Sequence, residues 1–118
     1  MDTYLQIYYH IVFSTKYRTA CLTNPGRKDL YRYISGVFRN KKCHLYQING
    51  AADHVHIFCH MHQDQSLSRL VKDVKLASTC FIKEMQLFEE FSGWQRGYAA
   101  FSHSDKEKGR LIRYIKNQ

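Results

Sequence analysis

The spacing of hydrophobic and polar positions changes several times along the chain, and each change predicts a boundary between secondary-structure elements. Dense aromatic and β-branched residues indicate strands, whereas apolar residues recurring every three or four positions indicate amphipathic helices. The pattern predicts, in order, a strand over residues 4–15, a helix over 27–41, strands over 43–49 and 54–60, a helix over 66–85, a short strand around 98–101 and a final helix after 104.

The first six of these elements follow the order of a split βαβ arrangement. We therefore expect an α+β, ferredoxin-like fold in which an antiparallel sheet carries two helices on one face. The final helix is an addition to that plan, and a capping box of Ser104 and Glu107 marks its start. It must pack on a sheet edge, on the open face or on a partner subunit. The length suits a single domain over residues 1–118.

The predicted strand over residues 54–60 alternates in character, so its side chains divide between the two faces of the sheet. The helix-covered face receives Val55, Ile57 and Cys59, and the open face receives His54, His56, Phe58 and His60. His54 and His56 are two positions apart, about 7 Å at Cβ. Their rings can converge on one metal ion, because neutral imidazole is a common ligand. Taken alone, an H-x-H pattern more often marks half-exposed polar residues of a sheet.

The last predicted helix places Tyr114 and Gln118 on one face, with Arg110 one turn earlier. A tyrosine oxygen can attack a phosphodiester and store the bond energy as a phosphotyrosine. For any one of the nine tyrosines, the ordinary alternative is packing in the core with the hydroxyl in water.

Charge and composition narrow the class of partner. Lysine and arginine exceed the acidic residues by eight, and such an excess favours a polyanion such as nucleic acid. Basic residues alternate with aromatics around Lys16–Arg18, Lys75 and Tyr98, a mixture suited to single strands. The N-terminus lacks a secretory signal pattern, and no apolar run is long enough to cross a membrane. The four widely spaced cysteines are expected to be buried thiols of a cytoplasmic protein.

Five segments together resemble one known family, the single-tyrosine HUH transposases of small bacterial insertion sequences. The similar segments span nearly the whole chain: YHIVFSTKYR at residues 9–18, NGAADHVHIF at 49–58, SLSRLVKDVKLAS at 66–78, GWQRGYAAFS at 93–102 and YIKNQ at 114–118. In order along one chain, they are far more specific than the histidine spacing alone.

The resemblance implies a role for particular residues. Tyr114 corresponds to the nucleophile that cleaves single-stranded DNA and leaves a 5′-phosphotyrosine and a free 3′-OH. His54, His56 and Gln118 correspond to the metal ligands. The implied ion is Mg²⁺ or Mn²⁺; the imidazole ligands favour Mn²⁺, because Mg²⁺ prefers oxygen. Asp53 is either a metal partner or, more commonly for an aspartate before a strand, a turn residue.

The resemblance also implies partners. Members act on single-stranded DNA hairpins at the ends of the element, and we expect contacts with DNA from Lys16, Arg18, Lys75 and Arg110. They form homodimers in which the tyrosine helix can complete the partner's site.

Three other functions stay open at this point. A degenerate transposase would bind hairpins without cleaving them. A ferredoxin-like domain that binds single-stranded or hairpin nucleic acid without catalysis would carry aromatics on the middle strands of its open face, where this sequence has His54 and His56. The replication-initiator and relaxase branch of the HUH group ranks last, because it normally uses a larger domain and a third histidine.

Overall fold

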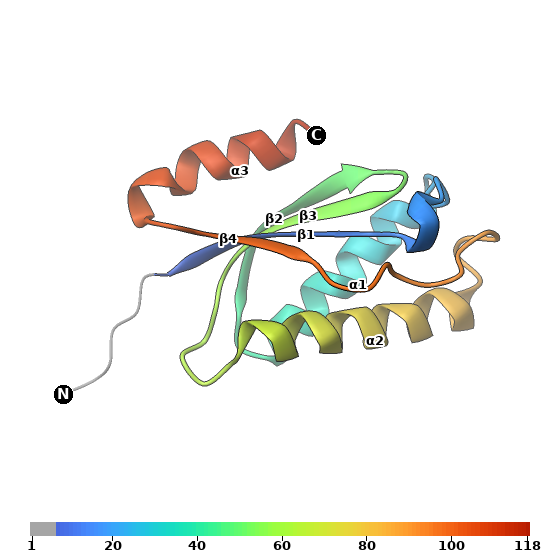
Figure 1. The fold of residues 1–118 in the computed structure, drawn as a ribbon, viewed down its shortest axis with the longest axis horizontal. Helices are drawn as coiled ribbons and strands as arrows, with labels where there is room; N and C mark the ends of the chain where they lie inside the picture. The colour runs from blue at the N-terminus through green and yellow to red at the C-terminus, as the bar shows by residue number, and fades with distance from the viewer. Residues whose placement is uncertain (1–6) are drawn as a thin grey trace.

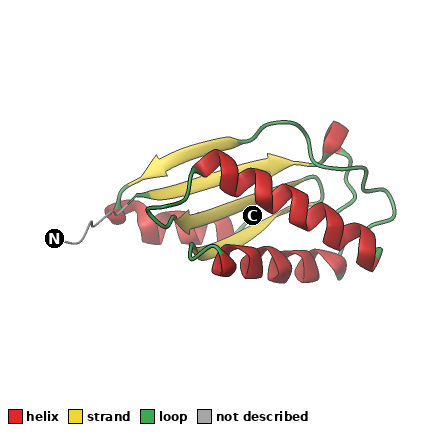
Figure 2. Ribbon diagram, turned by 90° about the horizontal axis from the view of Figure 1, so that it is seen from below, coloured by secondary structure: helices red, strands yellow, loops and turns green. Residues whose placement is uncertain are grey.

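The computed structural model describes residues 7–118 as an antiparallel sheet with helices on both faces (Figure 1). The elements are β1 (Tyr8–Ser14), η1 (Lys16–Arg18), α1 (Gly26–Asn40), β2 (His44–Ala51), β3 (His54–His60), α2 (Leu67–Met85), β4 (Ala99–His103), η2 (Asp105–Glu107) and α3 (Lys108–Lys116). The strands form one sheet (Figure 2), in which they lie side by side in the order β2-β3-β1-β4. This order, with α1 and α2 on one face, confirms the predicted ferredoxin-like fold.

The element boundaries agree closely with the pattern of the sequence. β3 spans the predicted residues 54–60. Ser66 caps α2, where its hydroxyl accepts a hydrogen bond from the Arg69 backbone N–H at 3.2 Å. The capping box is present, with the Ser104 N–H donating to the Glu107 carboxylate at 3.1 Å. β1 is shorter than predicted within the described residues, and residues 4–6 of the predicted strand lie outside them.

The main core lies between the sheet and helices α1 and α2. Val55, Ile57 and Cys59 of β3 are all at most 1% exposed there, as their alternation predicted. The helices contribute residues at three- and four-residue spacing to the same core, namely Leu30, Ile34 and Phe38 from α1 and Leu70, Val71, Val74 and Ile82 from α2.

Helix α3 packs on the opposite, open face of the sheet (Figure 1). Leu111 and Ile115 are buried against Tyr8 of β1 and Phe58 of β3, and these four residues form a second cluster. Because this face carries the histidines, the packing of α3 brings the tyrosine helix over the histidine strand. The prediction left three places for the final helix, and the structure selects the open face.

Two apolar side chains of α2 face solvent. Met85 continues the three- and four-residue spacing of apolar residues but is 60% exposed, because it ends the helix just before Gln86 reverses the chain in a left-handed conformation. Cys80 was expected to be buried but is exposed, unlike Cys21, Cys43 and Cys59. Cys80 lies two residues after buried Ser78, about 200° around the helix, and therefore faces solvent.

Gly50 is required where β2 passes β3 beside His54. A Cβ at Gly50 would lie 2.2 Å from the His54 carbonyl oxygen, a backbone atom that cannot move aside alone. We expect Gly50→Ala to lower the free energy of unfolding by about 1–3 kcal/mol in urea denaturation, because the strands must separate to admit the methyl group. Gly36→Ala is the matched control: nothing lies within 4 Å of the position that its added methyl group would take. In the middle of α1 this change should raise stability by up to about 1 kcal/mol. Equal effects of the two substitutions would contradict the close approach at Gly50.

Candidate active site

His54 and His56 lie together on the open face of β3. Their ring centroids are 5.0 Å apart with the planes at 75°. His56 is 9% exposed, and burial, reinforced by His10 and His54, lowers its pKa to about 4. The ring is therefore neutral at physiological pH, the form in which imidazole nitrogen binds metal.

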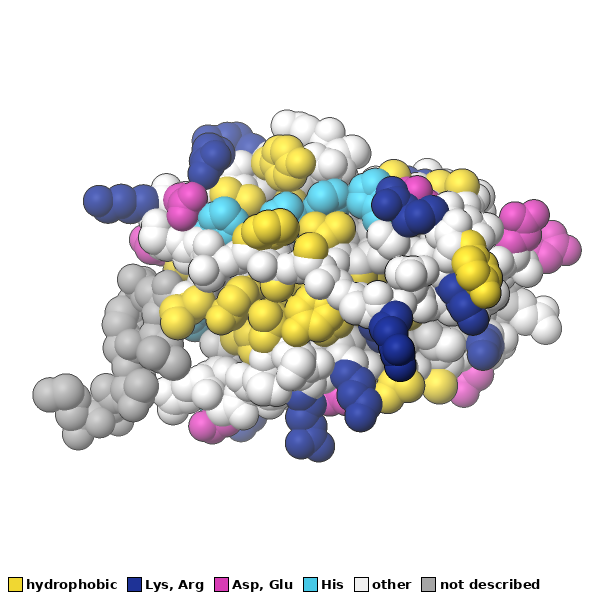
Figure 3. Space-filling model, in the orientation of Figure 1, with side chains coloured by type: hydrophobic (Ala, Val, Ile, Leu, Met, Phe, Trp, Pro, Cys, Tyr) yellow, Lys and Arg dark blue, Asp and Glu magenta, His cyan; other side chains and the backbone are white. Residues whose placement is uncertain are grey.

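His10 of β1 joins this pair, a residue that the sequence analysis missed. Its Nε2 lies 2.9 Å from His56 Nδ1 in a hydrogen bond, and the two rings stack at 5.1 Å. Burial lowers the pKa of His10, and the nearby His103 adds to the effect. Figure 3 shows histidine side chains in a row across this face, with hydrophobic side chains directly beside the row. Ile11 and Phe13 point to the core, so alternation could have placed His10 on the open face. The local pattern does not, however, predict the strand register that brings His10 beside His56.

Asp53 orients His54. The Asp53 carboxylate accepts from His54 Nδ1 at 2.7 Å and from Arg18 Nε at 3.1 Å. The hydrogen bond from His54, followed by the contribution of Arg18, holds the pKa of this carboxyl below its usual range. Asp53 therefore does more than form the turn before β3, because it fixes the His54 ring through Nδ1 and leaves Nε2 facing away from the carboxylate.

The two histidines present compatible donor atoms. His54 uses Nδ1 for Asp53, and His56 uses Nδ1 for His10. When His56 donates that hydrogen bond, Nε2 of both rings carries a free lone pair, as a divalent metal requires. Within residues 7–118, no cluster of three histidine, cysteine or acidic side chains could hold a metal. A metal here would therefore need a donor of another type, such as the amide oxygen of Gln118.

Tyr114 lies over the histidines of its own chain. Its ring centroid is 6.1 Å from that of His10 and 6.2 Å from that of His56, with both pairs edge to face. Leu111 and Ile115, both buried against the sheet, hold this part of α3 in place while Tyr114 remains 53% exposed. The structure thus brings together the predicted tyrosine and a histidine pair that lies 58 to 60 residues earlier in the chain.

Gln118 is anchored at the end of α3. Asn49 of β2 donates from its side chain to the carbonyl oxygens of Lys116 at 2.9 Å and of Gln118 at 3.3 Å. The Gln118 side-chain nitrogen donates to the Tyr114 carbonyl oxygen at 3.0 Å, and within residues 7–118 no hydrogen bond to the amide oxygen of Gln118 is formed. Asn49 therefore holds the chain end beside β2, a role that the sequence did not reveal.

The predicted DNA-contacting residues occupy separate places. Lys16 and Arg18 are exposed in η1, and the Arg18–Asp53 ion pair sets this segment beside His54. Arg110 is exposed on α3 and pairs with Glu107 at 3.0 Å. Lys75 lies on the α2 side of the sheet, away from the open face. Three of the four therefore lie on or beside the surface that carries the histidines and Tyr114.

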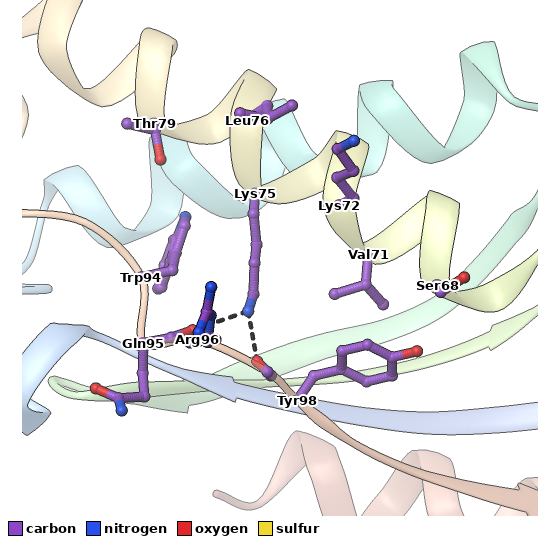
Figure 4. A pocket seen from close by; sticks show the side chains of 11 residues that line it. Ser68, Val71, Lys72, Lys75, Leu76, Thr79, Trp94, Gln95, Arg96 and Tyr98 are labelled. Carbon is purple, nitrogen blue, oxygen red and sulfur yellow. Dashed lines mark hydrogen bonds between the residues drawn. The ribbon is translucent and has the colours of Figure 1, made fainter.

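Lys75 holds the segment before β4. Its ammonium group donates to the carbonyl oxygens of Gln95, at 2.9 Å, and Gly97 (Figure 4). Burial lowers its pKa. Together with Trp94 and Tyr98 it lines an open pocket of about 400 Å³ between α2 and residues 94–98. The bonds to two carbonyls give Lys75 a structural role in this pocket.

Comparison with known proteins assigns the chain to a family. Residues 3–118 match the sequence profile of the family described as IS200-like transposases. The ISDra2 transposase TnpA of Deinococcus radiodurans is 27% identical over 121 residues, covering 96% of this chain and 84% of its own.

Two solved structures share the fold. A crystal structure of a protein assigned as a transposase from Deinococcus radiodurans R1 superposes with a TM-score of 0.77 at 20% identity, covering 100% of this chain and 95% of the other. A REP-associated tyrosine transposase bound to a REP hairpin superposes with a TM-score of 0.66 at 17% identity, covering 98% and 70%. Among residues 7–118, no helix is long and apolar enough to cross a membrane.

Proposed function

The chain belongs to the family of IS200-like transposases, and from this premise we propose that it cleaves and rejoins single-stranded DNA through Tyr114. The observation that carries the proposal is the position of the Tyr114 ring, about 6 Å from the rings of His10 and His56. An exposed phenol beside neutral imidazoles is a nucleophile placed next to a candidate metal site.

The proposed reaction exchanges one phosphodiester for another. The Tyr114 oxygen attacks the phosphorus, the bond from phosphorus to the 3′ oxygen breaks, and the 5′ end of the DNA stays on the tyrosine. The phenol loses its proton and the departing 3′ oxygen gains one. Attack by a 3′-OH reverses these changes and reseals the strand, so the bond energy is conserved and no high-energy cofactor is needed.

His54, His56 and Gln118 are the residues that would hold a divalent cation, Mg²⁺ or Mn²⁺. The two Nε2 atoms and the Gln118 amide oxygen would together supply a mixed nitrogen and oxygen donor set, a combination that suits Mn²⁺. When bound, such an ion offsets the negative charge that develops on the phosphate oxygens. Asp53 and His10 would orient these ligands, because each forms a hydrogen bond with the Nδ1 atom of one of the two histidines.

We expect Asp53→Asn to weaken Mn²⁺ binding by about 10- to 100-fold, because the amide is a poorer acceptor for His54 Nδ1–H than the carboxylate. Mn²⁺ affinity would be measured by calorimetry. Asp73→Asn is the matched control, since Asp73 forms an ion pair with Lys41 at 2.6 Å on another part of the surface. A loss of Mn²⁺ affinity in both variants, or in neither, would contradict the positioning role of Asp53.

We include hairpin DNA and a homodimer in the proposal. The hairpin bound to one structural relative and the excess positive charge of this chain support the nucleic-acid partner. Lys16, Arg18 and Arg110 are the proposed backbone contacts on the tyrosine side, and Lys75 contributes on the α2 side. In a homodimer the tyrosine helix would either stay on its own sheet or exchange with that of the partner.

Recognition of nucleic acid on an open sheet, as in RNA-recognition domains, fits the structure poorly. That mode needs exposed aromatic rings on the middle strands. Here Tyr8 and Phe58 of the middle strands are only 4% and 0% exposed, because α3 covers them.

The test is formation of a covalent adduct. Purified protein would be incubated with labelled single-stranded hairpins from the DNA flanking its gene, with Mn²⁺ or Mg²⁺, and resolved on a denaturing gel. We expect a metal-dependent shifted band whose DNA-bearing peptide contains Tyr114 by mass spectrometry. Hairpin binding without any adduct would contradict the proposal and identify a degenerate transposase that has kept recognition alone.

A further inference from the structure

Phe101 is an exposed aromatic ring on the edge of the sheet. It lies in the middle of β4, which follows β1 at the end of the strand order. Its side chain is 54% exposed, whereas Tyr8 and Phe58 on the same face are buried. The difference arises because α3 lies against β2 and β3 and leaves the β4 side of the open face uncovered.

The strand register places Phe101 next to the candidate active site. Phe101 is the direct partner of His10 across the β1–β4 pairing, so the two side chains share the open face. Their ring centroids are 5.9 Å apart with planes at 45°. His10 therefore has Phe101 beside it on the edge strand and Tyr114 beside it on α3.

We propose that the Phe101 ring is a stacking platform for a nucleobase of single-stranded DNA next to the phosphate attacked by Tyr114. This inference rests on the proposed function, because it takes its ligand from the same strand. A phenylalanine ring has no hydrogen-bonding group, so its exposed face offers apolar contact and stacking to a ligand. Unpaired bases stack on such rings regardless of sequence. The net charge of +8 suits a polyanionic ligand better than a second copy of this basic chain.

The test measures equilibrium binding in a Tyr114→Phe background, where chemistry does not interfere. Fluorescence anisotropy would follow a set of hairpin oligonucleotides, each with one abasic nucleotide at a different position of the single-stranded segment. We expect one position at which base removal weakens binding by about 5- to 150-fold, the effect of one lost stack. The Phe101→Ala variant should bind the full oligonucleotide more weakly by a similar factor. In that variant, removal of the base at the same position should not lower the affinity further. Phe101→Trp should keep the sensitivity, and Phe101→Leu, which keeps apolar bulk without a ring, should lose most of it.

Abasic effects that are the same with and without the Phe101 ring would overturn the proposal. So would a Phe101→Ala variant whose affinity loss accompanies a change of molecular mass in sedimentation, because the ring would then be a contact between copies of the chain. The adduct assay separates this result from the function itself. If the adduct forms at normal yield but the abasic effect does not depend on the Phe101 ring, only the stacking platform is refuted. If the abasic effect depends on the ring but no adduct forms, only the role of Tyr114 as nucleophile is refuted.

Discussion

Replacing Tyr114 by phenylalanine is expected to abolish the covalent protein–DNA adduct and leave hairpin affinity within about twofold. The substitution removes one oxygen atom, the proposed nucleophile, and keeps the ring that packs beside His10 and His56. Loss of a nucleophile without a substitute lowers the rate by more than about a thousandfold. No hydrogen bond of the Tyr114 hydroxyl occurs within residues 7–118, so the free energy of unfolding should not change.

Adduct yield on denaturing gels and affinity by fluorescence anisotropy would be measured on the same preparations. Tyr98→Phe is the matched control, because Tyr98 is also an exposed tyrosine but lies in the pocket beside α2. It should form the adduct at the wild-type level. An adduct that survives in Tyr114→Phe would show that another residue attacks the DNA.

Replacing His56 by alanine is expected to remove both metal binding and cleavage. His56 is a proposed ligand, and its loss also leaves Nε2 of His10 without its hydrogen-bond partner. We expect Mn²⁺ affinity to fall by more than the roughly 10- to 100-fold that is typical when a residue hydrogen-bonded to a metal ligand is replaced. Calorimetry would report the metal and the gel assay would report the adduct. Hairpin affinity measured without metal should remain, because the cationic side chains are untouched.

His62→Ala controls for the loss of an imidazole as such. His62 lies beyond the end of β3 and pairs with Asp64 at 3.7 Å. This variant should bind Mn²⁺ and form the adduct normally. Unchanged Mn²⁺ binding in His56→Ala would place the metal elsewhere, and the donor set proposed for His54, His56 and Gln118 would be wrong.

Mixing the Tyr114→Phe and His56→Ala proteins tests which chain supplies the tyrosine. In this structure α3 packs on its own sheet through Leu111 and Ile115, so each inactive chain should stay inactive in the mixture. Recovery of the adduct would require Tyr114 of one chain to act at the histidines of another. That outcome would show exchange of the tyrosine helix between subunits.

The arrangement of the site explains why the additional helix matters. Without α3, Tyr8 and Phe58 would expose apolar surface on the middle strands, and the histidines would face solvent. With α3 in place, burial of Leu111 and Ile115 stabilises the helix on the sheet and carries Tyr114 to His56 as a consequence. The contacts that hold α3 on the sheet therefore also place the proposed nucleophile.

Local pattern was sufficient for most of the fold. Strand alternation assigned Val55 and Ile57 to the core and His54 and His56 to the open face, because neighbouring side chains of a strand must point in opposite directions. The Ser104–Glu107 capping box marked the start of the last helix, because its hydrogen bonds span only three residues. The pattern was less accurate in α2, where Met85 at the end of the helix and Cys80 on its outer side face solvent.

Tertiary structure alone decided how the parts of the site meet. His10 and His56 are 46 residues apart, and only the register of β1 with β3 brings their rings together. The same holds for Phe101 beside His10 and for α3 on the open face. Likewise, only the tertiary structure showed that the Lys75 ammonium group donates to the carbonyl oxygens of Gln95 and Gly97. Short-range periodicity determines which face a side chain takes, whereas the pairing of distant segments depends on how the whole chain buries its apolar surface.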